Sequence, residues 1–118
     1  MFAEIDDAQV LSVMPACQRG DAGAVARLYD LYADRIYRYV LARTGDPHTA
    51  EDLTADVFLR VVQNVQRFKL DATRPAGSVS AWLYRIAGNL VADYHRVRRR
   101  RPVVSMEEEA SSAFDELG

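Results

Sequence analysis

Apolar residues recur at steps of three and four positions along most of this chain, which is the spacing of an amphipathic helix. Four segments carry the pattern, at about residues 7–19, 22–44, 47–68 and 81–99. No segment alternates apolar and polar residues as a half-buried strand does. The sequence therefore predicts an all-α fold, a compact helical bundle of about four helices. The side chains expected in its core are Val10, Leu11, Met14, Cys17, Val25, Leu28, Tyr32, Ile36, Tyr39 or Val40, Ala50, Leu53, Val57, Val61, Val65, Phe68, Leu83, Ile86, Leu90, Tyr94 and Val97.

Local signals mark where the first three helices end and begin. Gly20 followed by Asp21 pairs a helix stop with an N-cap, and Gly45 ends the second segment. Asp46 before Pro47 pairs an N-cap with a proline at the first helical position. These signals place the two connections between the first three helices.

The segment before the fourth helix has the composition of a loop. Residues 69–80 contain Pro75, Gly77 and two serines, with little periodicity. We therefore expect a loop of about a dozen residues, a length that often carries function. Ser78 or Ser80 is expected to cap the helix that follows.

The composition excludes several classes of protein. Of the 118 residues, 49% are apolar and 27% charged, which is too apolar for a disordered chain. A single cysteine, Cys17, excludes an internal disulfide framework and a cysteine-based zinc site, and two histidines are too few for a histidine-rich site. No apolar run approaches the roughly 20 residues that span a bilayer, and no signal segment opens the chain. We expect a cytoplasmic protein without a metal or other cofactor.

The net charge of −2 hides an uneven distribution along the chain. Residues 46–56 carry four acidic side chains and no Lys or Arg, whereas residues 57–101 carry ten basic side chains against two acidic ones. Residues 102–118 carry five acidic side chains and no Lys or Arg. The basic part favours a polyanionic partner such as nucleic acid, even though the sequence pI is about 5.6.

The third helix presents an acidic face. Asp52 and Asp56 stand four positions apart and share one side, which Leu59 and Gln63 continue. Carboxylates near a helix N-terminus suit the helix dipole and solubility. They also suit the docking of a basic partner. A Mg²⁺-dependent hydrolase is a weaker alternative, because no third ligand or general base is evident near them in the sequence.

The fourth helix presents a basic face. Arg and Asn are the side chains that contact phosphates and base edges, and an aromatic side chain such as Trp82 either anchors the core or stacks on an unpaired base. A run of like charges makes sense chiefly beside a polyanion. The polar positions opposite the core stripe are Arg85, Asn89, Ala92 or Asp93, Arg96, and the terminal run Arg98, Arg99, Arg100 and Arg101.

Three blocks of sequence resemble region 2 of bacterial sigma factors, specifically the extracytoplasmic-function (ECF) group. They are LYDLYADRIYRYVLARTGD (28–46), AEDLTADVFLRVVQNVQRF (50–68) and SAWLYRIAGNLVADYHRVRRRRP (80–102). The resemblance covers roughly residues 22–102, with the blocks in the expected order and spacing. It implies the all-helical sigma-2 domain and a promoter-specificity subunit, which is not an enzyme and has no catalytic residues.

The second block implies a contact with RNA polymerase. In the family this helix docks on the clamp helices of the β′ subunit of the core enzyme. The resemblance assigns the contact to Asp52 and Asp56, with Leu59 on the same side and Ala55 where the family often has glutamine. The two carboxylates supply the charge that meets a basic surface.

The third block and the loop before it imply recognition of promoter DNA. In the family this part captures the −10 element, and a base of the non-template strand is flipped into a loop pocket. Gly88 stands where many relatives carry a larger side chain beside the Asn. The DNA-binding residues that the resemblance and the basic face together indicate are Trp82, Arg85, Asn89, Arg96, Arg98, Arg99, Arg100 and Arg101.

The expected organisation is a sigma-2 helical domain at residues 1–102, followed by an acidic interdomain linker or tail at residues 103–118. The second helical domain of ECF factors, which binds the −35 element, has no counterpart after residue 102, so we expect a fragment. The resemblance also implies an anti-sigma factor as a partner. Two alternatives from the residues alone are an Arg-rich helical module that binds nucleic acid without polymerase and an interaction bundle with an acidic protein partner.

Overall fold

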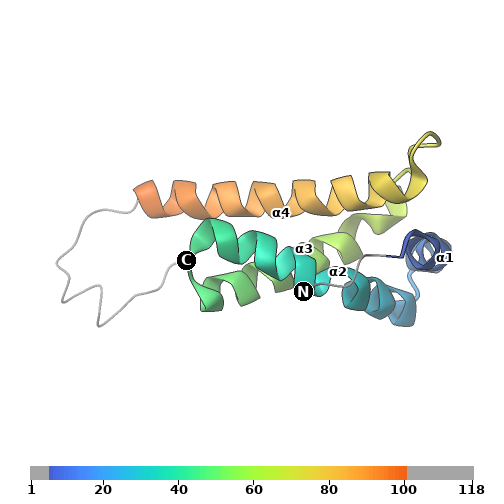
Figure 1. The fold of residues 1–118 in the computed structure, drawn as a ribbon, viewed down its shortest axis with the longest axis horizontal. Coiled ribbons are helices and arrows are strands. Elements are labelled where there is room, and N and C mark those ends of the chain that lie inside the picture. The colour runs from blue at the N-terminus through green and yellow to red at the C-terminus, as the bar shows by residue number, and fades with distance from the viewer. Residues whose placement is uncertain (1–5, 101–118) are drawn as a thin grey trace.

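The computed structural model describes residues 6–100, and all regular structure in that range is helical. This confirms the predicted all-α bundle of four helices, although the end of the third helix tightens into a 3₁₀ turn. The elements in chain order are α1 (Asp7–Gln18), α2 (Ala22–Thr44), α3 (Pro47–Asn64), the 3₁₀ turn η1 (Val65–Arg67) and α4 (Pro75–Arg100) (Figure 1).

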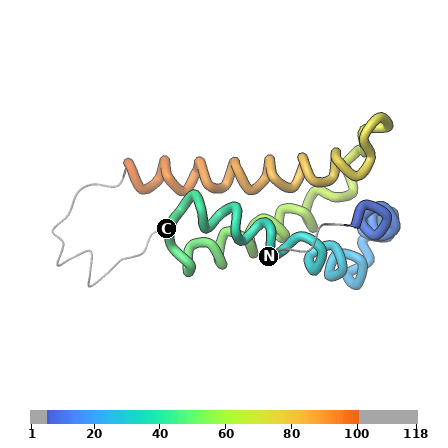
Figure 2. The backbone as a smooth tube through the Cα atoms, in the orientation of Figure 1, coloured from blue at the N-terminus to red at the C-terminus, as the bar shows by residue number. Residues whose placement is uncertain are grey.

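The longest helix, α4, lies along the length of the α2–α3 hairpin and packs against both of its helices (Figure 1). Helix α1 lies across the end of the bundle where α4 begins, and it contacts α2, α4 and η1. At the other end, α4 runs past the turn between α2 and α3 (Figure 2). The last turns of α4 therefore have no helix beneath them.

Aspartate side chains cap the first three helices. Asp6 accepts hydrogen bonds from the backbone N–H groups of the first turn of α1, and Asp21 does the same for α2. Asp46 accepts from the backbone N–H of Thr49 and from its hydroxyl. Gly45 ends α2 at φ 74°, a left-handed conformation that glycine adopts at little cost. The predicted caps at Asp21 and Asp46 and the predicted stop at Gly45 are confirmed.

The predicted loop at residues 69–80 is wrong in length, because α4 begins at Pro75. Proline has no N–H to leave unsatisfied and its fixed φ suits the first helical position, so Pro75 starts the helix. Ser78 lies inside the first turn of α4, where its hydroxyl donates to the carbonyl of Pro75 and accepts from the N–H of Asp71. The connection is thus only residues 68–74, and neither Ser78 nor Ser80 is an N-cap.

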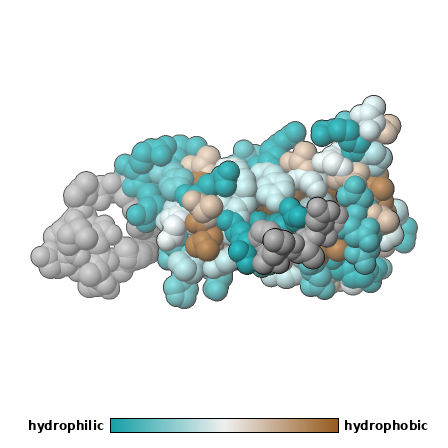
Figure 3. All heavy atoms as spheres, in the orientation of Figure 1, coloured by the Kyte–Doolittle hydropathy of each residue, from teal (hydrophilic) through white to brown (hydrophobic). Residues whose placement is uncertain are grey.

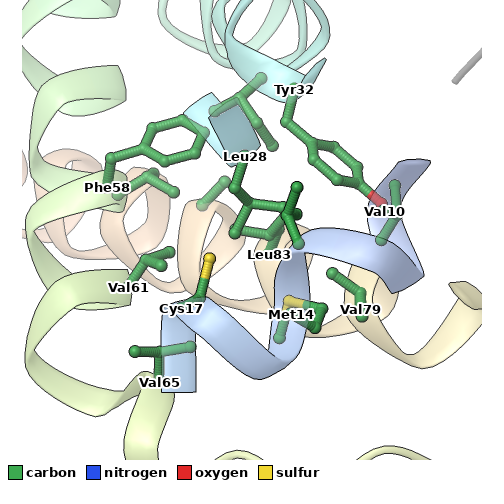
Figure 4. Close-up of a cluster of buried hydrophobic side chains, with 14 of the residues drawn as sticks. Val10, Met14, Cys17, Leu28, Tyr32, Phe58, Val61, Val65, Val79 and Leu83 are labelled. Carbon is green, nitrogen blue, oxygen red and sulfur yellow. The ribbon is translucent and has the colours of Figure 1, made fainter. Parts of the chain in front are cut away.

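The core forms where the buried side chains of α1 meet those of α2, of α4 and of the end of the α3 segment (Figure 4). Most of the predicted core is buried or half-buried. Leu11 is only half-buried, and Val97 is 38% exposed. The buried side chains that were not predicted are Val13, Ala24, Thr54, Phe58, Ala76, Val79, Ala87 and Val91. Val97 lies in the last turn of α4, whose end runs past the α2–α3 turn.

Candidate nucleic-acid and protein interfaces

The predicted polar side chains of α4 form one exposed stripe. Arg85, Asn89, Ala92, Arg96 and Arg99 follow each other at steps of four, three, four and three, and all are exposed. The sequence left open whether Ala92 or Asp93 belongs to the stripe, and the structure places Ala92 on it. Asp93 is half-buried and forms an ion pair with Arg96.

The C-terminal end of α4 carries a concentration of positive charge. Arg98, Arg99 and Arg100 are exposed, and the guanidinium of Arg98 lies 5.4 Å from the ring centroid of Tyr94. Figure 3 shows hydrophilic side chains gathered over this end of α4. Within residues 6–100, the side chains of Arg99 and Arg100 have no acidic partner, so their charges are available to an anion. Arg101 and the acidic segment 103–118 lie outside the described residues.

A pocket of about 290 Å³ opens between the end of α3 and the first half of α4. It brings three of the predicted DNA-binding residues together in space. It also adds residues from α3 and η1 that the sequence analysis did not identify. The lining residues are Arg60, Asn64, Arg67, Phe68, Trp82, Arg85, Ile86 and Asn89.

The apolar part of this pocket is an aromatic stack. The rings of Phe68 and Trp82 have centroids 4.4 Å apart and planes inclined by 24°. Both side chains are half-buried and pack against the core while they also line the pocket. Trp82 therefore packs against the core, as one of the two predicted alternatives has it, and the same side chain lines the pocket.

Hydrogen bonds within the protein hold the polar side chains that line one side of the pocket. Asn64 donates from its side chain to the carbonyl of Arg60 at 2.9 Å, and its side-chain oxygen accepts from the guanidinium of Arg67. Across from them, within residues 6–100, Arg85 and Asn89 make no side-chain hydrogen bond to the protein. The pocket thus offers unused donors, and at Asn89 an unused acceptor, beside a flat aromatic surface.

The sequence contains a pattern that marks the pocket residues Arg60, Asn64 and Arg67. Arg60, Asn64 and Arg67 recur at steps of four and three, away from the apolar stripe of the same segment. This spacing places them on one side of a helix, immediately before the predicted loop. The pattern indicates a polar face, but not that α4 lies across from it.

The short connection between η1 and α4 is held by its own side chains. Asp71 accepts from the backbone N–H of Thr73 at 2.9 Å and from its hydroxyl at 2.7 Å. These hydrogen bonds hold the pKa of Asp71 below its ordinary value, because they favour the charged carboxylate. The connection is therefore a defined turn at the edge of the pocket.

The predicted polymerase-binding residues lie together on the outer face of α3. Asp52, Ala55, Asp56 and Leu59 are all exposed, and Leu59 keeps 55% of its surface in contact with solvent. Within residues 6–100, neither carboxylate has a basic partner. Val62, which is 54% exposed, extends this face by one turn and was not predicted. The face combines free negative charge with exposed apolar surface.

Beside this face, a shallow groove of about 280 Å³ runs between α2 and α3. Ala55 belongs to both surfaces, because it also lines the groove. The other lining residues are Tyr29, Ala33, Asp34, Tyr37, Glu51 and Thr54. The groove extends the acidic surface of α3 onto α2.

The model of the sigma-70 region 2 family matches residues 28–101, well over half of the chain. The match spans both the acidic face of α3 and the pocket. This chain belongs to the sigma-70 region 2 family. The family assignment confirms the resemblance seen in the three sequence blocks.

Curated relatives of this sigma region support the ECF group. The chain is 41% identical to the ECF RNA polymerase sigma factor BldN of Streptomyces coelicolor over 90% of its own length. It is 34% identical to SigW of Bacillus subtilis over 80%, and 36% identical to SigE of Mycolicibacterium smegmatis over 76%, both of them ECF sigma factors. The chain spans only 39%, 46% and 34% of the lengths of BldN, SigW and SigE.

A solved structure supports the fold of this sigma region. A chain of the RsbN–BldN complex matches with a TM-score of 0.60 and 44% sequence identity. The match covers 71% of the present chain and 58% of the chain from the complex. The four-helix arrangement is therefore that of a sigma-2 domain.

Gly88 of this sigma region faces α2 rather than the polar stripe. A Cβ placed on Gly88 would lie 3.2 Å from the hydroxyl oxygen of Tyr39. Gly88 thus lies at a close contact between α4 and α2. A larger side chain here would first have to displace Tyr39.

Among residues 6–100, no group of three or more His, Cys, Asp or Glu side chains is placed to hold a metal ion. In the same range, no helix is both long enough and apolar enough to cross a membrane.

Proposed function

We propose that this chain is the part of an ECF sigma factor that binds core RNA polymerase and captures the promoter −10 element. The outer face of α3 meets the β′ clamp helices, and the pocket beside α4 receives a base of the non-template strand. Both events take place in the cytoplasm, where the polymerase works. The family assignment supports the general function, and the two surfaces support its division between α3 and α4.

The pocket is the observation that carries the proposal. A flipped base needs a flat surface to replace its lost neighbours, polar groups that match its edge, and cations for the flanking phosphates. The Phe68–Trp82 stack, Asn89 and the surrounding arginines supply these three needs in one place. Unstacking costs a few kcal/mol, and stacking on aromatic side chains returns about 1–3 kcal/mol per base. Capture is therefore energetically feasible.

The terminal arginines of α4 suit a different task. They are exposed at the end of a helix and do not line the pocket beside Trp82, so they suit the binding of phosphates rather than the reading of sequence. Arg85 and Asn89 stand at the pocket, one helical turn apart, and are suited to contact base edges. We therefore assign sequence recognition to the first half of α4 and backbone binding to its end.

The α3 face suits a protein partner of opposite charge. Two exposed carboxylates steer a basic surface, and Leu59 and Val62 supply apolar contact once the surfaces meet. Core polymerase is the partner we propose for this face. An anti-sigma factor is a second proposed partner, because the matched solved structure is a complex of BldN with RsbN.

Reconstitution with core RNA polymerase tests the proposal. The chain should be retained by the core enzyme, and the resulting complex should bind a single-stranded non-template −10 oligonucleotide more tightly than the matching duplex. Binding of duplex DNA by the chain alone, with no retention by the core enzyme, would instead support the Arg-rich module that acts without polymerase.

A further inference from the structure

We propose that Gln18, at the end of α1, is a positioning residue that sets the Phe68–Trp82 stack for base capture. The inference rests on the proposed function only for its DNA-binding readout. Gln18 lies outside the range that the family model matches, which begins at residue 28. Its side chain nevertheless reaches across the molecule to the residue that begins the pocket's aromatic surface.

The contact is a pair of hydrogen bonds from one amide nitrogen. Nε2 of Gln18 donates to the carbonyl oxygen of Phe68 at 2.6 Å and to that of Val65 at 3.3 Å. Both carbonyls lie at the end of the helical segment, where the intrahelical hydrogen bonds run out, and that of Val65 also accepts from the backbone N–H of Phe68. Gln18 is half-buried, so the bonds are partly shielded from water.

The hydrogen bonds from Gln18 matter most at Phe68. Its backbone is extended, with φ −68° and ψ 138°, and it stands between η1 and the turn that leads to α4. The backbone N–H of Phe68 donates to the carbonyl of Val65, and its own carbonyl is held by Gln18. Because both sides of the residue are fixed, the ring of Phe68 has a defined place against Trp82.

The donor itself is firmly placed. Gln18 is the last residue of α1, directly after the buried Cys17. The turn that follows is closed by backbone hydrogen bonds from Gly20 to Cys17 and from Asp21 to Ala16. Helix α1 thus acts as a rigid support whose last side chain fixes the aromatic surface of the pocket.

Trp82 is the single tryptophan of the chain, so its fluorescence reports on the stack directly. Gln18→Met keeps the length of the side chain but has no donor, and Gln18→Glu presents an acceptor to two carbonyl oxygens. We expect both variants of the full 118-residue chain to shift the Trp82 emission to longer wavelength and to increase its quenching by acrylamide. The change should be larger for Gln18→Glu, since its carboxylate repels the carbonyls.

Core polymerase reconstituted with the same variants should bind the single-stranded −10 oligonucleotide more weakly, by up to about fivefold. The free energy of one hydrogen bond sets this ceiling, because the variants must order Phe68 when the base binds. The matched control is Asp46→Ala, which removes the cap of α3 at the end far from η1. It should lower the melting temperature but leave the Trp82 emission and the oligonucleotide affinity unchanged at temperatures well below melting.

A double-variant cycle tests the route through Phe68. In a Phe68→Leu background the stack is already lost, so Gln18→Met should cause no further loss of affinity. The proposal is overturned if Gln18→Met leaves the Trp82 spectrum and the affinity at wild-type values, or if Asp46→Ala changes both as much as Gln18→Met does. If core polymerase reconstituted with the wild-type chain binds no oligonucleotide at all, the proposed function fails, and the Trp82 spectra still decide the role of Gln18.

Discussion

The hydroxyl of Tyr32 on α2 is fully buried and lies 2.6 Å from the hydroxyl oxygen of Ser80 on α4. A buried hydroxyl without a partner loses its hydration and gains nothing in return. Ser80→Ala should therefore cost about 1–3 kcal/mol in the free energy of unfolding. The Tyr32→Phe/Ser80→Ala pair should cost less than the sum of the single variants, as measured by urea unfolding. Additive costs would contradict the contact.

Burial also raises the pKa of Tyr32 above its ordinary value of 10.0. The folded state thus favours the protonated hydroxyl, and this contribution to stability is complete below pH 10 and is lost as the pH rises through the folded pKa. Tyr32→Phe should flatten the alkaline decline of stability, measured by urea unfolding across that range. The exposed Tyr29→Phe is the control, and an equal flattening in both variants would refute the explanation.

Gly88 carries a prediction about helix packing. Replacing a glycine inside a helix with alanine stabilises it by about 1 kcal/mol, but a Cβ on Gly88 would crowd the hydroxyl of Tyr39 at 3.2 Å. Gly88→Ala should therefore stabilise the domain less in the wild-type background than in Tyr39→Phe, which removes that hydroxyl. Thermal unfolding of the four proteins measures the difference. An identical gain in both backgrounds would mean that Tyr39 does not restrict this position.

The acidic face of α3 carries a prediction about polymerase. Reversing both Asp52 and Asp56 to Arg should abolish retention by core RNA polymerase, because it inverts the charge that we propose meets the β′ clamp. Helicity and melting should change little, since exposed charges contribute little to stability. Asp30→Arg, an exposed reversal on α2, is the control for a change in charge alone. Normal retention of a folded double variant would exclude this face as the clamp contact.

The acidic segment 103–118 carries a prediction about DNA binding. It has five acidic and no Lys or Arg side chains, so its deletion should tighten the weak binding of duplex DNA, most strongly at low salt. A full-length variant with the five acids changed to their amides should behave like the deletion. Unaltered affinity across a salt series, in either variant, would show that the segment does not compete with nucleic acid.

The sequence predicted the hairpin of α2 and α3 well because its boundary signals are local. Asp21, Gly45 and Asp46 act within their own turns, so their roles can be read without knowledge of the packing. The start of α4 was missed because its signal is not local in this way. Proline is typical of loops as well as of the first helical position. At Pro75 the choice between the two depends on contacts around it, such as the hydrogen bond from the N–H of Asp71 to the hydroxyl of Ser78.

The pocket was predictable only in part. Arg85 and Asn89 were identified from one helix, since their spacing fixes a shared face. The approach of Arg60 and Asn64 to that face depends on how α3 packs against α4, which no local pattern encodes. The contact from Gln18 to Phe68 spans 50 positions and was not predicted for the same reason.

The central claim is that the first half of α4 reads the −10 sequence and its end holds the backbone. The most direct measurement is the binding of single-stranded −10 oligonucleotides, with each position varied in turn, to polymerase reconstituted with Asn89→Ala or Arg99→Ala. Asn89→Ala should cost about 1–3 kcal/mol at one position and relax the preference there. Arg99→Ala should weaken all sequences alike and reduce the salt slope by about one. Uniform weakening by Asn89→Ala, together with a changed base preference in Arg99→Ala, would contradict this division of α4.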